Sequence, residues 1–146
     1  MEAVSVTDLT VGSKPFTDRD YTFTNVGIYP NTCFFIRGAM DDKITPSNSV
    51  QTSIKVRFPC TIYLDFLGGQ SHLNLVSAAW IGDWNDASEA IPTVWGNTGP
   101  GKVMKQNFDA GTINLMGNNG GTPTSGHGTY YAFVCPQGSS ISYIPA

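Results

Sequence analysis

Alternation of apolar and polar residues most constrains the fold of this chain. The alternation recurs in short stretches, and almost no segment spaces its apolar residues at the helical period. The stretch TSIKVRF alternates most clearly, and its Ile54, Val56 and Phe58 are predicted to share one face of a strand. Lys55 and Arg57 fall on the opposite face. Because successive side chains of a strand point to opposite faces of a sheet, this pattern predicts a strand with one face on a core.

Further short stretches of β character are bounded by glycine, proline, asparagine or aspartate. The predicted strands lie within residues 21–27, 32–38, 61–66, 92–97, 102–108, 112–116 and 129–136. Residues 102–108 and 112–116 are expected to form a hairpin in which Gly111 makes the turn. About seven to nine short strands predict an all-β fold, an antiparallel β-sandwich of jelly-roll or immunoglobulin-like type. Residues 1–146 are expected to form a single domain.

Charged residues are scarce, because Asp, Glu, Lys and Arg make up 13% of the chain and the net charge is −3. That is about half of the usual charged share, and Gly, Ser, Thr and Asn supply the polarity instead. The chain has no cluster of Lys and Arg that could neutralise phosphates, which argues against a nucleic-acid partner. No apolar stretch approaches the roughly 18 residues of a transmembrane helix, so no membrane span is expected.

The three cysteines, Cys33, Cys60 and Cys135, show neither CxxC spacing nor histidine partners, so no zinc site is predicted. Two arrangements stay open at this stage. One is a disulfide with one free thiol, and the other is three small buried thiols.

The segment WIGDWND, residues 80–86, brings two of the three tryptophans close together. Residues 75–80 are predicted as a strand and residues 83–90 as one or two helical turns that begin at Asp83. Trp80 follows an apolar stretch and is expected in the core. Trp84 has two interpretations, either a cap on the edge of the sandwich or an exposed ring on which a sugar stacks.

Several phrases of the sequence together resemble a known type of module. They are FTDRDYTFTNV (16–26), IRGAMDDK (36–43), VRFPCTIYLDF (56–66), AAWIGDW (78–84), VMKQNFDAGTINLMGNN (103–119) and the final TYYAFVCP (129–136). In this order they are similar to the small β-sandwich modules attached to secreted polysaccharide-degrading enzymes of the agarase and pectin-lyase type. The resemblance spans about residues 14–136, and the loop after Asn119 is longer than the pattern requires.

The resemblance implies a non-catalytic accessory role, carbohydrate binding above all. It also implies secretion. MEAVSVTDLT lacks the charged and apolar regions of a signal peptide, so either the chain is intracellular or its leader lies outside this chain, and the secreted alternative is the one expected. It supplies no ligand residues, because the matching positions are scaffold positions.

The candidate carbohydrate site rests instead on residue chemistry. Indole rings pack against the C–H faces of sugars, while carboxylate and amide groups bind the hydroxyls. The residues with that chemistry in turns are Trp84, Asp83, Asn85, Asp86, Trp95, Asn97, Asn118 and Asn119.

No catalytic residue and no cofactor is predicted. GQSHL around His72 is not a G-x-S-x-G nucleophile elbow, and His127 is expected to be an exposed loop histidine. A Ca²⁺ site at Asp41 and Asp42, or at Asp83 and Asp86, is a weaker alternative, because no EF-hand spacing supports it.

The sequence therefore predicts a lectin-like, carbohydrate-binding module whose partner is a polysaccharide or glycan. A self-assembling structural protein of the extracellular-matrix type is the alternative, which keeps a homo-oligomer open. A small glycan hydrolase is the third hypothesis, and it would need two carboxylates about 5–9.5 Å apart, which sequence spacing does not show.

Overall fold

A computed structural model describes residues 2–5, 23–25, 33–37, 49–66, 78–87, 94–95, 102–117 and 130–137. The described elements are β1 (Glu2–Ser5), β2 (Phe23–Asn25), β3 (Phe34–Arg37), β4 (Val50–Val56), β5 (Cys60–Phe66), α2 (Ala78–Ile81), β6 (Asn85–Asp86), β7 (Val94–Trp95), β8 (Lys102–Phe108), β9 (Gly111–Met116) and β10 (Tyr130–Pro136). The only helix among them, α2, is a single turn, and the described part of the chain has no helix that could cross a membrane.

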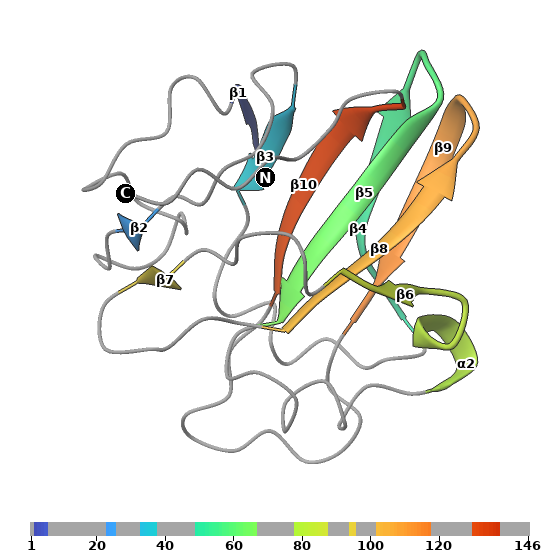
Figure 1. The fold of residues 1–146 in the computed structure, drawn as a ribbon. Coiled ribbons are helices and arrows are strands. Elements are labelled where there is room, and N and C mark those ends of the chain that lie inside the picture. The colour runs from blue at the N-terminus through green and yellow to red at the C-terminus, as the bar shows by residue number, and fades with distance from the viewer. Residues whose placement is uncertain are drawn as a thin grey trace.

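The strands form an antiparallel β-sandwich, as the sequence predicted. The larger sheet has six strands in the order β1-β3-β10-β5-β8-β6 (Figure 1). A second sheet pairs β4 with β9, and β2 pairs with β7 in a third, short ladder. Side chains from the larger sheet and from β4 and β9 share one hydrophobic core, which makes these two sheets the layers of the sandwich.

The predicted hairpin between residues 102–108 and 112–116 is wrong. Strand β8 pairs with β5 in the larger sheet, whereas β9 pairs with β4 in the smaller one. The chain therefore changes sheets between β8 and β9, and it does so again between β4 and β5, at the same end of the sandwich (Figure 1). Gly111 lies at the corner between β8 and β9, and its φ of 142° is one that other residues rarely adopt.

The core between the two sheets comes from alternate residues of neighbouring strands. Its fully buried members include Ile62, Leu64 and Phe66 of β5, which confirms the predicted inner face of that strand. From the opposite layer, Ile113 and Leu115 of β9 close the core. The two corners thus bring the inner faces of β5 and β9 together, which the local pattern of neither strand specifies.

The other face of the larger sheet is buried as well. Phe35 of β3 packs against Tyr131 and Phe133 of β10, with ring centroids 5.8 and 5.2 Å apart. Beside them lies Asp65, a carboxylate with no exposed surface. Strand β10 is accordingly buried on both faces, as its uninterrupted apolar sequence predicted.

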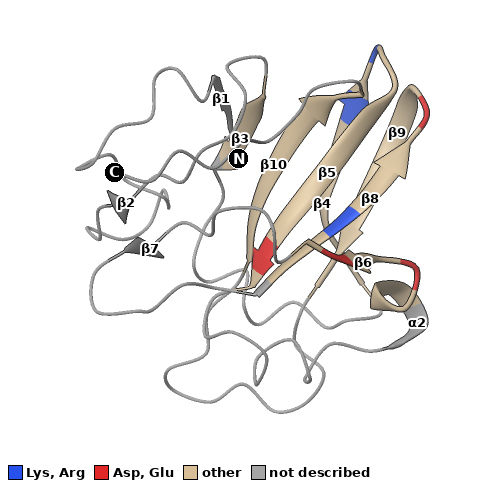
Figure 2. Ribbon diagram, in the orientation of Figure 1, with Lys and Arg blue, Asp and Glu red and all other residues tan. Residues whose placement is uncertain are grey.

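Charged residues on the sheets are few and are distributed over several elements (Figure 2). Lys55 and Arg57 belong to the end of β4 and the corner that follows it, whereas Asp83 and Asp86 lie around β6. The described surface therefore carries local charge rather than a continuous charged face.

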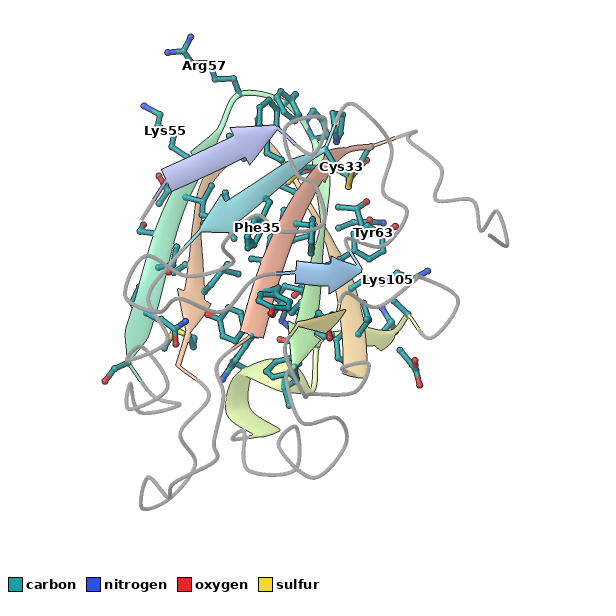
Figure 3. The ribbon with its side chains drawn as sticks, turned by 90° about the vertical axis from the view of Figure 1, so that its left-hand side faces the viewer. Cys33, Phe35, Lys55, Arg57, Tyr63 and Lys105 are labelled. Carbon is teal, nitrogen blue, oxygen red and sulfur yellow. A yellow bond between two sulfur atoms is a disulfide. The ribbon has the colours of Figure 1, made fainter. Side chains whose placement is uncertain are left out.

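One of the two cysteine arrangements left open by the sequence is realised. Cys33 and Cys135 form a disulfide across the neighbouring strands β3 and β10, with a Cα–Cα distance of 4.2 Å. Cys60 is a free thiol without exposed surface. Figure 3 shows Cys33 near one end of β3, beyond Phe35. The disulfide therefore joins segments that are 102 residues apart in the chain.

Candidate binding groove

The corner around WIGDWND has a different local structure from the predicted one. Residues 78–81 form the helix α2 where a strand was expected, and residues 85–86 form the strand β6 where helical turns were expected. A turn joins the two elements, and in it the backbone N–H of Trp84 donates to the carbonyl of Ile81 at 3.0 Å. The turn directs the Trp84 side chain inward.

Trp84 belongs to the hydrophobic core and keeps only 8% of its surface exposed. Its ring meets Trp80 edge-on, with centroids 6.0 Å apart, and Phe108 at 5.7 Å. Trp80 packs against the core from its edge, and its indole N–H donates to the carbonyl of Gly117 at 3.1 Å. The more deeply buried member of the pair is thus Trp84, and its burial counts against a stacking platform at this ring.

The polar residues next to Trp84 remain at the surface. Asp83, Asn85 and Asp86 are all exposed, and β6 pairs Asn85 with Lys105 of β8 at the edge of the larger sheet. The structure therefore brings three of the predicted site residues together at the surface, but the Trp84 ring beside them is buried.

The other predicted site residues are placed only in part. Trp95 lies on β7, where its partner is Phe23 of β2, and its side chain is outside the described residues. The remaining predicted residues, Asn97, Asn118, Asn119, His72, His127, Asp41 and Asp42, lie outside the described residues altogether. Within the described ranges, no group of three or more His, Cys, Asp or Glu side chains is arranged to hold a metal ion.

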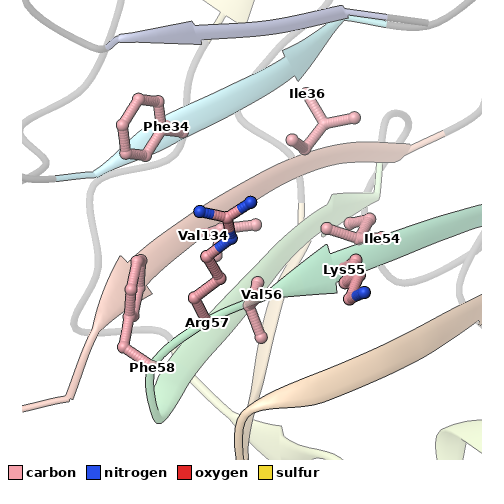
Figure 4. A pocket seen from close by; sticks show the side chains of 8 residues that line it. All are labelled: Phe34, Ile36, Ile54, Lys55, Val56, Arg57, Phe58 and Val134. Carbon is pink, nitrogen blue, oxygen red and sulfur yellow. The ribbon is translucent and has the colours of Figure 1, made fainter.

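A groove of about 270 Å³ opens between β3 and β10 of the larger sheet and β4 of the smaller one (Figure 4). We call it the β3–β4 groove, and its walls are Phe34, Ile36, Ile54, Lys55, Val56, Arg57, Phe58 and Val134. Among the described strands, the smaller sheet has two and the larger sheet six. The smaller sheet packs on β5 and β10, whereas Phe34 and Ile36 of β3 keep part of their surfaces exposed. The groove is thus the open side of the sandwich.

Two phenylalanines stand out in this groove because they are exposed. Phe34 keeps 41% and Phe58 37% of their surfaces accessible, and both lie at the same end of the groove in Figure 4. The sequence predicted Phe58 on the inner face with Ile54 and Val56, and this is wrong. Strand β4 ends at Val56, and Arg57 and Phe58 lie in the bend before Pro59, so the alternation stops before it reaches Phe58.

Two cations line the same groove. Lys55 and Arg57 are exposed, and among the side chains that the structure describes no acidic one lines the groove. In Figure 4 the Arg57 side chain is seen in front of the groove, between the two phenylalanines and Ile54 in that view. Figure 3 shows Lys55 and Arg57 projecting from the same end of the molecule. The groove therefore combines an apolar floor with hydrogen-bond donors that carry positive charge.

The buried titratable groups are less accessible. Burial raises the pKa of Tyr131, and the negative charge of Asp65 raises it further. Burial also raises the pKa of the Cys60 thiol. Because Tyr131 and Cys60 have almost no exposed surface, a ligand at the surface does not contact them, whereas the residues of the β3–β4 groove are accessible.

Local sequence gave little indication of this groove. TCFFIRG is apolar throughout, so it does not show which phenylalanine faces outward. The one available signal was Phe58 directly before Pro59, because proline ends the ladder and lets the preceding side chain turn out.

Comparison with known proteins gives one structural similarity. No protein-family model matches the chain, and no curated protein is similar to it in sequence. A solved structure of a β-glucuronidase from glycoside hydrolase family 2 is similar, with a TM-score of 0.67 and 17% sequence identity. The similarity covers 93% of this chain but 13% of that enzyme. The β-sandwich of this chain thus also occurs as a small part of a carbohydrate-active enzyme.

Proposed function

We propose that this chain is a non-catalytic carbohydrate-binding module and that the β3–β4 groove holds the sugar. The observation that carries the proposal is the pair of exposed rings, Phe34 and Phe58, at the end of the groove. The C–H faces of a pyranose pack on such rings, and the Lys55 and Arg57 groups donate hydrogen bonds to its oxygens. The site therefore lies away from Trp84, where residue chemistry alone first suggested it.

Three further observations support this proposal. The fold recurs within a glycoside hydrolase, the sequence resembles accessory modules of agarases and pectin-type lyases, and the chain is poor in charge but rich in hydroxyl and amide groups. The disulfide between Cys33 and Cys135 fits a secreted protein, because disulfides persist in oxidising compartments. We therefore include secretion and a role as an accessory module in the proposal.

Binding to polysaccharides tests the proposal directly. Affinity gel electrophoresis against agarose, pectin, polygalacturonate, xylan and chitin derivatives should show retardation of the wild-type protein by at least one of them. Phe34→Ala and Phe58→Ala should each weaken that binding by about two- to tenfold, given about 0.5–1.5 kcal/mol per aromatic contact.

Val50→Ala is the matched control, because Val50 is an exposed apolar residue of β4 that does not line the groove. It should bind as the wild type does. Failure of the wild-type protein to bind any polysaccharide, or equal loss in all three variants, would contradict the proposal.

The alternative, a self-assembling structural protein, draws on the same exposed phenylalanines. The free thiol does not favour it, because Cys60 is buried and is not positioned to join two copies. Light scattering from micromolar to millimolar concentration separates the alternatives. Growth of the particle mass that Phe34→Ala and Phe58→Ala abolish would favour assembly through the groove.

A further inference from the structure

The charge of the β3–β4 groove differs from that of the rest of the protein. The chain carries 11 acidic against 8 basic residues. Among the side chains that the structure describes, the basic ones are Lys55, Arg57 and Lys105, and the acidic ones are Asp65, Asp83, Asp86 and Asp109. Two of these three cations line the groove, and none of these four acids does. Figure 2 shows blue at the end of β4 and at the corner after it, and red around β6 and at the corner between β8 and β9.

The spacing of the two cations suits a ligand with repeated negative charges. Lys55 is the last residue but one of β4, and Arg57 is the first residue of the bend that follows, so the two positive charges come from neighbouring positions of the chain. Both side chains leave the same end of the molecule, beside the apolar floor of the groove (Figure 3). One anionic group of a ligand can therefore meet the guanidinium while a second meets the ammonium.

The chemistry of Arg57 favours oxyanions in particular. A guanidinium presents its N–H donors as a planar fork that matches a carboxylate or a sulfate. Because the groove has an open side, the desolvation cost of such a pair is small, and so is its net contribution. The rings of Phe34 and Phe58 supply the non-electrostatic part of the binding.

We infer that the β3–β4 groove is specific for acidic polysaccharides. Their uronate carboxylates or sulfate esters pair with Arg57 and Lys55, while the C–H faces of the same sugars pack on Phe34 and Phe58. This inference rests on the proposed carbohydrate-binding function and adds the ligand class to it. A neutral polysaccharide offers the rings the same packing but leaves both cations without a partner.

The decisive experiment compares ligands that share a backbone and differ in charge. Isothermal titration of the wild-type protein with polygalacturonate and with fully methyl-esterified pectin should give tighter binding to the acid form. Heparin and dermatan sulfate, tested against chemically desulfated forms, distinguish sulfate from carboxylate as the recognised group. Raising NaCl from about 50 to 500 mM should weaken the binding several-fold, because salt screens exposed charges.

Substitutions assign the effect to the groove. Arg57→Gln and Lys55→Gln should each weaken binding of the acidic polymer by about two- to fivefold, and the double variant by about tenfold, as exposed ion pairs do. Binding of the esterified polymer should not change. Lys105→Gln removes the same charge outside the groove and serves as the control, provided that its unfolding temperature matches that of the wild type.

The outcomes distinguish failure of the charge specificity from failure of the proposed carbohydrate binding. Equal binding of acidic and esterified polymers, lost in Phe34→Ala and Phe58→Ala, would overturn the charge specificity and leave carbohydrate binding intact. Full binding by the Lys55→Gln/Arg57→Gln variant would also overturn it. The absence of binding to every polysaccharide would overturn both.

Discussion

Breaking the disulfide between Cys33 and Cys135 should remove a large part of the stability of this fold. The bond closes a chain segment with a sequence separation of 102 residues. In the chain-entropy model, a cross-link across a loop of about 100 residues restricts the unfolded state by about 4.7 kcal/mol. A domain of this size is stable by about 5–15 kcal/mol in total, so the loss is between about a third and nearly all of it. At an m-value of about 2 kcal/mol/M, the urea midpoint should fall by about 2 M.

The assay is equilibrium unfolding in urea, followed by tryptophan fluorescence, with and without a phosphine reductant. Because both sulfur atoms are buried, the protein is first unfolded with the reductant and then refolded, so that reduction is complete. Cys33→Ala/Cys135→Ala should show a low midpoint that the reductant does not change. Cys60→Ala should keep the full effect of the reductant, because its thiol takes no part in the bond.

Two results would refute this reasoning. An unchanged midpoint of the reduced wild-type protein would show that the covalent link contributes little to stability. Loss of the reductant effect in Cys60→Ala would show that the disulfide in solution pairs Cys60 with either Cys33 or Cys135.

Two further predictions concern buried residues. Trp84→Ala should destabilise the protein by about 3–5 kcal/mol in urea unfolding, because it empties a core position between Trp80 and Phe108, while polysaccharide retention of the folded fraction stays unchanged. Wild-type stability combined with lost retention would instead assign Trp84 to the binding surface. The pKa values of Cys60 and Tyr131 are raised above the ordinary 9.0 and 10.0, so the unfolded chain releases these protons first, and stability should fall as the pH rises above about 9. Urea midpoints at about pH 8 and pH 10.5 check this, and an equally steep fall in Cys60→Ala/Tyr131→Phe would contradict it.

Most of the strands could be predicted from the sequence, because the signals for them are local. The alternation in β5 placed Ile62, Leu64 and Phe66 on an inner face, and the apolar run of β10 indicated burial on both faces. Turn residues between the stretches then favoured an antiparallel β-sandwich over other folds. Each of these inferences depends on residues that are neighbours in the chain.

The pairing of strands could not be predicted in the same way. Residues 102–108 and 112–116 have the spacing of a hairpin, yet β8 and β9 join different sheets. The partner of each strand is set by pairings such as β5 with β8 and β4 with β9, which join residues far apart in sequence. Similarly, three cysteines allowed a disulfide, but only the neighbouring positions of β3 and β10 determined which two form it.

By itself, the sequence determined the fold class, the positions of most strands and the low charge of the surface. Only the tertiary structure decided that Trp84 is buried and that Phe34 and Phe58 are exposed. Exposure depends on which layer covers a side chain, and among the described strands the smaller layer has two where the larger one has six. That difference in width leaves the β3–β4 groove open next to Lys55 and Arg57.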